Sequence, residues 1–232
     1  MRKALAFLFL LLATGVHAED PDVLWKLVND RCVPAARAGQ PPAPCVSVDL
    51  ARKVAVLKDR NGLYQYLAIP TDKITGIEDP AVLDSQFTFA VAWETRHAVE
   101  AKRGRPLPRD AISLAVNSRN GRSQNQLHIH VDCLDADTRS RLHGAAIGET
   151  FAPFRWKLAG HTYLARILKS PSLDTINPFK LLADHLGTPI GDWTLVVTGA
   201  TLSDDSPGFI LLASNEGRAS GEELQDHACL GH

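Results

Sequence analysis

Two histidines alternate with apolar residues in segment 117–133, which reads NSRNGRSQNQLHIHVDC. In a β-strand, side chains two residues apart point to the same face. Gln126, His128 and His130 are therefore expected to share one face, while the residues between them enter the core. The loop just before them carries arginine and small polar residues, which can bind the non-bridging oxygens of a phosphate. Because an imidazole can attack phosphorus, the segment predicts a phosphate site with a histidine nucleophile.

A His-x-His pair alone is also compatible with two structural histidines or with a metal-handling protein. Zinc sites usually have a third protein ligand. The one acidic neighbour is Asp132, and we expect it to point to the opposite face of the strand from the histidines. The sequence therefore predicts no metal and no cofactor.

The elements that must position this segment alternate between short β-rich runs and helices. Asn61-Gly62 is a turn signal for a hairpin between two apolar runs. Residues 86–103 repeat apolar residues at helical spacing. Ser220 and Glu223 have the spacing of a capping box, which predicts a closing helix. The other expected elements are helices at 21–29, 135–147 and 178–186 and strands at 46–48, 54–57, 63–69, 111–116, 126–133, 151–168, 193–198 and 209–214.

Strands joined mainly by hairpins, with helices grouped between them, indicate an α+β fold around a mainly antiparallel sheet. Residues 1–18 have two basic residues, an apolar stretch and a small residue before an acidic pair, which is the layout of a secretory signal. An uncleaved anchor is the alternative. We expect one domain over 19–232, with a core at about 46–150 and a C-terminal elaboration at about 151–232.

The balance of charge excludes a general nucleic-acid-binding surface, because 25 Lys+Arg face 26 Asp+Glu. Four cysteines in an exported chain point to two disulfides, and three pairings are possible. Cys32 and Cys45 flank a Pro-rich stretch that needs a covalent staple. That pairing leaves Cys133 with Cys229, which would tie the C-terminal tail to the histidine strand.

The alternating histidine segment resembles the histidine triad superfamily, in which the central histidine of one strand is the covalent nucleophile. His128 matches that nucleophile and His130 the last histidine, whereas Gln126 stands where the first histidine usually is. The resemblance implies a HIT-like fold, with Asp59 at the ribose. It also implies catalytic roles for His128, His130 and Gln126, and a phosphate-binding loop formed by Asn117, Arg119, Arg122, Ser123, Gln124 and Asn125.

Several blocks together resemble the bacterial CDP-diacylglycerol pyrophosphatase family more closely. These are the Cys-flanked Pro-rich segment, the NSR-x-GR-x-QN-x-x-HIH segment, GHTYLAR at 160–166 and QDH-x-C at 225–229. The resemblance implies hydrolysis of CDP-diacylglycerol to CMP and phosphatidate, a membrane surface as partner, and a location in the periplasm at the inner membrane. Alternatives are a nucleotidylyl transferase, a soluble nucleotide hydrolase, or an inactive periplasmic binding module.

Two further groups of residues leave their roles open. His161, Tyr163 and Arg166 are predicted either to contact the lipid phosphate or to pack a strand. Phe151, Phe154 and Trp156 could form an apolar rim toward a membrane, but a place in the core is favoured. Other histidines, His227 among them, have no constellation around them and are expected to be structural.

Overall fold

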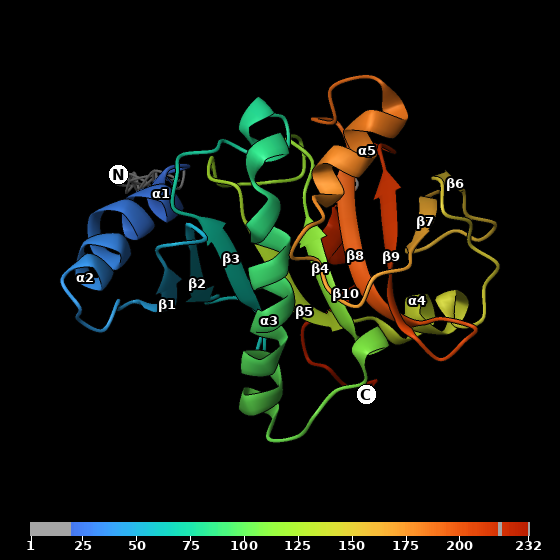
Figure 1. The fold of residues 1–232 in the computed structure, drawn as a ribbon, viewed down its shortest axis with the longest axis horizontal. Coiled ribbons are helices and arrows are strands. Elements are labelled where there is room, and N and C mark those ends of the chain that lie inside the picture. Colours follow the sequence, from blue (N-terminus) through green and yellow to red (C-terminus); the bar gives the residue numbers. More distant parts are fainter. Residues whose placement is uncertain (1–19, 218–219, 232) are drawn as a thin grey trace, which may run out of the picture.

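A computed structural model describes residues 20–217 and 220–231. The predicted signal at 1–18 lies outside the described residues. One sheet carries all the described strands in the order β1-β2-β3-β5-β4-β8-β9-β7-β6, with β10 paired to β5 (Figure 1). Its strands are β1 (Cys45–Asp49), β2 (Val54–Lys58), β3 (Tyr66–Pro70), β4 (Ile112–Val116), β5 (Ile129–Leu134), β6 (Ala152–Pro153), β7 (Leu164–Leu168), β8 (Thr194–Thr201), β9 (Pro207–Ser214) and β10 (Gln225–Asp226).

Each pairing between these strands is antiparallel, which confirms the predicted fold class. The helices are α1 (Val23–Leu27), α2 (Val33–Arg37), α3 (Gln86–Arg103), α4 (Ala136–Leu142) and α5 (Pro178–Leu186). A π-helical turn, η1 (Val28–Cys32), joins α1 to α2, and three 3-10 turns complete the set: η2 (Pro80–Asp84), η3 (Arg109–Ala111) and η4 (Gly221–Leu224).

The predicted helices at 86–103 and 178–186 have the observed bounds of α3 and α5. Both end at a glycine with left-handed backbone, Gly104 at φ 75° and Gly187 at φ 63°, a conformation that glycine adopts without steric cost. The predicted hairpin across Asn61-Gly62 is also present, because β2 pairs with β3 from Val54–Pro70 to Lys58–Tyr66.

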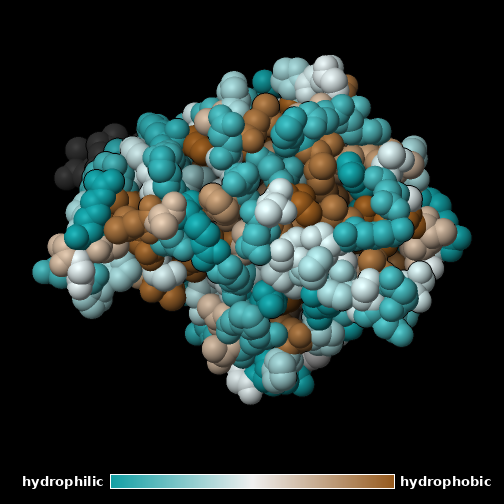
Figure 2. Space-filling model, in the orientation of Figure 1, coloured by the Kyte–Doolittle hydropathy of each residue, from teal (hydrophilic) through white to brown (hydrophobic). Residues whose placement is uncertain are grey.

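Helix α3 covers one face of the sheet, as Figure 1 shows. Leu127, Ile129 and Val131 are almost completely buried in the same core as Phe89 and Trp93 of α3. The prediction that the residues between the histidines enter the core is therefore confirmed. On this side Figure 2 shows apolar residues near the N-terminal helices and around α5, while the outer side of α3 is mainly hydrophilic.

The histidines occupy the opposite face. Leu67 of β3 lies directly across from His130 of β5, and directly opposed residues share a face. Leu67 packs in a separate core with Leu24 and Val28 of the N-terminal helical segment. The same face is covered further along by the residues around η4, since Leu224 packs with Leu134 in a third core. The site therefore lies between the N-terminal helices and the C-terminal segment.

Several predicted elements have different bounds. The helix expected at 21–29 continues through η1 and α2 to Arg37. The strand expected from residue 126 begins at Ile129, because the Gln126 side chain is bound to a neighbouring loop. The helix expected to 147 ends at Leu142, and the strand-like stretch 151–168 contains only β6 and β7.

The closing helix with a capping box was a wrong prediction. The segment forms the single 3-10 turn η4, and the side chain of Ser220 makes no cap hydrogen bond. Its Oγ instead donates to Oδ1 of Asn117 at 2.9 Å, while the Glu223 carboxylate accepts from Tyr163. These long-range contacts replace the local ones that the spacing suggested.

Both expected disulfides are present, Cys32–Cys45 and Cys133–Cys229. The sheet contains strands from both sides of residue 150, and the domain boundaries given above stay a prediction. Among the described residues, none of the helices has the length and hydropathy needed to cross a membrane.

Candidate active site

His128 directly precedes β5 and is partly exposed. Its Nδ1 is 2.6 Å from the main-chain oxygen of Gln126. Since a carbonyl oxygen only accepts, this contact assigns the proton of the neutral ring to Nδ1 and leaves the lone pair on Nε2. Burial lowers the pKa of His128, opposed by the same hydrogen bond and by Glu222 and Asp59. The imidazole is thus neutral at neutral pH and has an open nitrogen.

The side chain of Gln126 is fully buried and is bound to the 70–74 segment. Its Nε2 donates to the main-chain oxygens of Pro70 and Asp72, both at 2.9 Å, and its Oε1 accepts from the amide of Ile74 at 3.3 Å. The hydrogen bond to His128 thus comes from the backbone of residue 126, whereas the amide group fixes a loop. A catalytic role for the Gln126 side chain stays a prediction.

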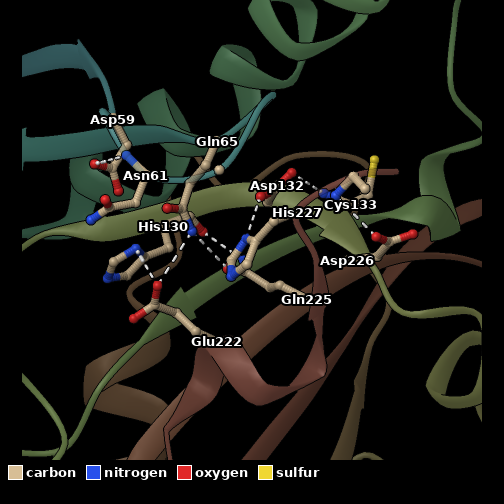
Figure 3. Close-up of polar contacts among 12 residues, drawn as sticks. Asp59, Asn61, Gln65, His130, Asp132, Cys133, Glu222, Gln225, Asp226 and His227 are labelled. Carbon is tan, nitrogen blue, oxygen red and sulfur yellow. Dashed lines mark hydrogen bonds and ion pairs between the residues drawn. The ribbon is translucent and has the colours of Figure 1, made fainter. Parts of the chain in front are cut away.

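His130 is the neighbour of His128, with ring centroids 4.7 Å apart, and its side chain is almost entirely buried. Its Nδ1 lies 3.1 Å from Oε2 of Glu222 (Figure 3). Burial lowers the pKa of His130 well below its usual value, with further contributions from His128 and His227. Neither ring nitrogen has a well-aligned hydrogen bond to the described residues. An orphan polar group of this kind is suited to a ligand oxygen.

Glu222 of η4 is a site residue that the sequence analysis missed. Its Oε1 accepts from Nδ2 of Asn117 at 2.7 Å, and Oδ1 of Asn117 accepts from Ser220 and from the amide of Gly221. Asn117 thus joins the loop after β4 to the C-terminal segment, and its predicted contact with phosphate stays a prediction.

Arg122 does meet His128, since both line a cavity of about 10 Å³ together with Asn117 and Gln126. Its guanidinium faces the carboxylate of Glu78 in a two-point ion pair, with Nη1 at 2.8 Å, and its Nε donates to the Gln124 main chain. The side chain is 9% exposed. Arg122 therefore acts on His128 as a fixed, paired charge.

Arg119 points elsewhere. It makes a two-point ion pair with Asp192 at 2.8 and 2.7 Å, and both side chains are about half exposed. The other predicted loop residues also differ, because one is exposed and two are hydrogen-bonded to the N-terminal segment. Ser123 is exposed, whereas Gln124 accepts from the amide of Leu24 and the amide of Asn125 donates to Pro21. The loop is thus attached to the start of the N-terminal helical segment, and its predicted phosphate contacts stay predictions.

Asp59 directly follows β2 and is partly buried. One of its carboxylate oxygens accepts from the amide of Asn61, and its charge raises the pKa of both His128 and His227. Its predicted contact with ribose stays a prediction, but the structure places it near the reacting imidazole.

The expectation for Asp132 was wrong. Residues 128, 130 and 132 are separated by two, so Asp132 shares the histidine face, as the strand period requires. It is completely buried, and its Oδ2 lies 2.8 Å from Nδ1 of His227 (Figure 3). His227, expected to be structural, thus belongs to the same face as His130. The signal in the sequence was Cys229, whose disulfide partner Cys133 follows Asp132 directly.

A metal site needs several ligating side chains that converge on one point. Among the described residues, the one cluster of three such side chains is Asp132 with Cys133 and Cys229. Both sulfurs are joined in a disulfide, so they are not thiolate ligands. The cluster is not a metal site.

The GHTYLAR block at 160–166 contacts η4. Glu223 accepts hydrogen bonds from Tyr163 and faces Nδ1 of His161, both at 2.7 Å. Tyr163 is fully buried. Phe151 and Phe154 are buried as well, and Trp156 is partly buried against the same core as Phe154, which confirms the favoured place of these three aromatic residues in the core. Arg166 lies over the ring of Phe151. Because Glu223 directly follows Glu222 in η4, the contacts of His161 and Tyr163 with Glu223 also position Glu222, which faces His130.

An imidazole with an open nitrogen, beside a second imidazole and an arginine-bearing loop on an antiparallel sheet, suits an enzyme that cleaves phosphorus–oxygen bonds. Comparison with known proteins gives the particular kind. The family model described as CDP-diacylglycerol pyrophosphatase matches residues 19–231. A curated CDP-diacylglycerol pyrophosphatase from Yersinia pestis is 39% identical over 238 residues, covering 96% of this chain and 91% of the relative. The chain belongs to the CDP-diacylglycerol pyrophosphatase family and is a hydrolase.

Proposed function

We propose that the chain cleaves CDP-diacylglycerol to CMP and phosphatidate through a covalent nucleotidyl-His128 intermediate. Nε2 of His128 attacks the α-phosphorus, and a nitrogen–phosphorus bond forms while the bond to the bridging oxygen breaks. The electron pair leaves with the phosphate of phosphatidate. Water then forms a new oxygen–phosphorus bond, the nitrogen–phosphorus bond breaks, and CMP is released.

The observation that carries this proposal is the 2.6 Å contact between Nδ1 of His128 and the Gln126 main-chain oxygen. It orients the ring and supports the tautomer whose Nε2 is the nucleophile. The same carbonyl stabilises the positive charge that the ring acquires when Nε2 bonds to phosphorus. The low pKa of His128 that burial produces keeps the free ring neutral before attack.

Charge on the transferred phosphate must be stabilised by nearby donors. His130 supplies a buried ring nitrogen without a well-aligned partner, and Arg122 supplies a fixed charge at the small cavity that it lines with His128. The leaving group is already a phosphate, so it needs little protonation. No step of this scheme requires a metal.

The test is to incubate the purified chain with CDP-diacylglycerol carrying radioactive phosphorus in the α position and to quench the reaction with base. Label on a peptide containing His128, lost on mild acid treatment, is expected for a phosphoramidate. His128→Asn should abolish the label and reduce turnover by at least about 1,000-fold, because an amide is not a nucleophile here. Full turnover in this variant would refute the covalent route. Added glycerol tests the transferase alternative, since CMP-glycerol would appear.

We further propose export to the periplasm and action at the inner membrane surface. The two disulfides support export, because such bonds persist in oxidising compartments. Fractionation of cells and a labelling assay with an impermeant thiol reagent after reduction would test the location. Recovery of the protein in the cytosol with free thiols would contradict it.

A further inference from the structure

The buried carboxylate of Asp132, two residues after His130, takes no part in the attack of His128 on phosphorus. Asp132 is completely inaccessible to solvent, and its neighbours are the imidazole of His227 at 2.8 Å and the amide of Cys133 at 2.8 Å. A charge removed from water needs a partner. His227 provides that partner while keeping 45% of its own side chain exposed. The pair thus connects a buried carboxylate with solvent.

The hydrogen bond settles which nitrogen of His227 is open. Nδ1 faces Oδ2 of Asp132, so Nε2 is the nitrogen that can exchange a proton with another group. The hydrogen bond to Asp132 raises the pKa of His227. A carboxylate behind a histidine in this way orients the ring and stabilises the imidazolium that forms when the ring accepts a proton.

His227 lies on the same face of the sheet as the reacting imidazole, because the rings of His128 and His130 are 4.7 Å apart and Asp132, the next residue on that face, holds His227 at 2.8 Å. Asp59 on the β2–β3 turn and Glu222 on η4 raise the pKa of both His128 and His227. The pKa of His130, which lies between His128 and Asp132 in the sequence, is lowered by burial first and then by His128 and His227. The charged groups that act on His227 are Asp132, Glu222 and Asp59, and His227 in turn lowers the pKa of His130. Asp226 and Lys58 interact with Asp132.

A disulfide joins the segment that carries Asp132 to the segment that carries His227. Cys133 follows Asp132, Cys229 lies two residues after His227, and the two cysteines form a disulfide across a separation of 96 residues. Strand β10 adds the pairing of Asp226 with Cys133. The disulfide therefore fixes the relative position of the carboxylate and the imidazole.

We infer that His227 and Asp132 form the general-base dyad for the second half of the reaction; this rests on the proposed covalent route. As the oxygen of water bonds to phosphorus, its proton passes to Nε2 of His227. The nitrogen–phosphorus bond breaks, and the electron pair returns to Nε2 of His128. Asp132 stabilises the imidazolium of His227, and the exposed ring then releases the proton to solvent.

The experiment follows both products in one rapid-quench assay of CDP-diacylglycerol in detergent micelles. In His227→Gln, a burst of phosphatidate equal to the number of active sites should remain, while CMP release slows by about 100-fold or more. Labelled His128 should accumulate. His97→Gln is the matched control, because His97 also pairs with a carboxylate, Glu100, but lies on the exposed side of α3. Its two products should appear at the wild-type rates.

Chemical rescue separates a base from a structural partner. In His227→Ala, added imidazole should restore CMP release without changing the phosphatidate burst. Across a series of substituted imidazoles, the rate of rescued CMP release should rise with the pKa of the imidazole. Near-uniform slowing of both products, or unchanged CMP release in His227→Gln, would overturn the dyad. Absence of label on His128 in the wild type and in every variant would instead refute the covalent route, so the two failures are distinguishable.

Discussion

Replacing Gln126 by leucine tests whether its side chain supports the fold or the reaction. The amide is fully buried and makes three hydrogen bonds, to Pro70, Asp72 and Ile74, while the main-chain oxygen of residue 126 accepts from His128. Leucine has a similar volume and retains that main-chain oxygen. The substitution therefore removes the clamp on the loop and leaves the hydrogen bond that sets the His128 tautomer.

The expected loss of stability follows from the three hydrogen bonds. At a net value of about 1 kcal/mol each, the free energy of unfolding should fall by roughly 3 kcal/mol, and more if the loop cannot find other partners. Urea unfolding of the oxidised protein should show a lower midpoint and an unchanged slope. Gln124→Leu is the control, since its amide makes weaker contacts at 3.1 and 3.4 Å near the surface. It should lose about 1 kcal/mol or less.

The activity measurement decides between the two roles. Because the His128 ring keeps its backbone partner, the burst of phosphatidate in Gln126→Leu should slow by no more than about 10-fold at a temperature where the variant is folded. Unchanged stability together with a burst slowed by more than about 100-fold would refute this reasoning. The amide of Gln126 would then act on the reacting groups, as the resemblance to the histidine triad suggested.

Three other outcomes are expected. Lowering the pH to 6.5 should leave the phosphatidate burst intact, because burial lowers the pKa of His128 and keeps its ring neutral. It should slow CMP release, because Asp132 raises the pKa of His227, which is then protonated and no longer a base. Parallel loss of both steps would contradict this. Cys229→Ser should reduce the free energy of unfolding by about 4 kcal/mol in urea titrations and slow CMP release as His227→Gln does; wild-type CMP release in the folded variant would argue against the disulfide as a clamp. Glu78→Gln should lower the free energy of unfolding by roughly 3 kcal/mol, because the nearly buried charge of Arg122 would lose its partner. An unchanged urea midpoint would show that the ion pair contributes nothing to stability.

Local patterns predicted the elements whose causes are local. Residues 86–103 form a helix because apolar residues recur every three to four positions and Gly104 supplies a left-handed end. The turn at Asn61-Gly62 likewise specifies its own hairpin. The alternation around His128 placed the intervening residues in the core for the same reason.

Contacts between distant segments could not be predicted in this way. Glu222 reaches His130 across 92 positions, and His227 reaches Asp132 across 95. Only the sheet order, with β10 on β5, brings these residues together, and strand order is not encoded in any local spacing. Asp132 was a different case, because the period-two rule already placed it with the histidines and was misapplied.

The charges around the loop separate two arginines that look equivalent in the sequence. Arg122 is almost buried against Glu78, so breaking that pair to bind a phosphate would leave a carboxylate without its partner, at a cost of several kcal/mol. Arg119 and Asp192 are both about half exposed, and such pairs contribute only about 0–1 kcal/mol. A pyrophosphate can therefore displace Asp192 from Arg119 at little cost. The two arginines thus differ in what they can offer: Arg122 contributes a fixed, paired charge beside His128, whereas Arg119 could exchange its carboxylate partner for a phosphate.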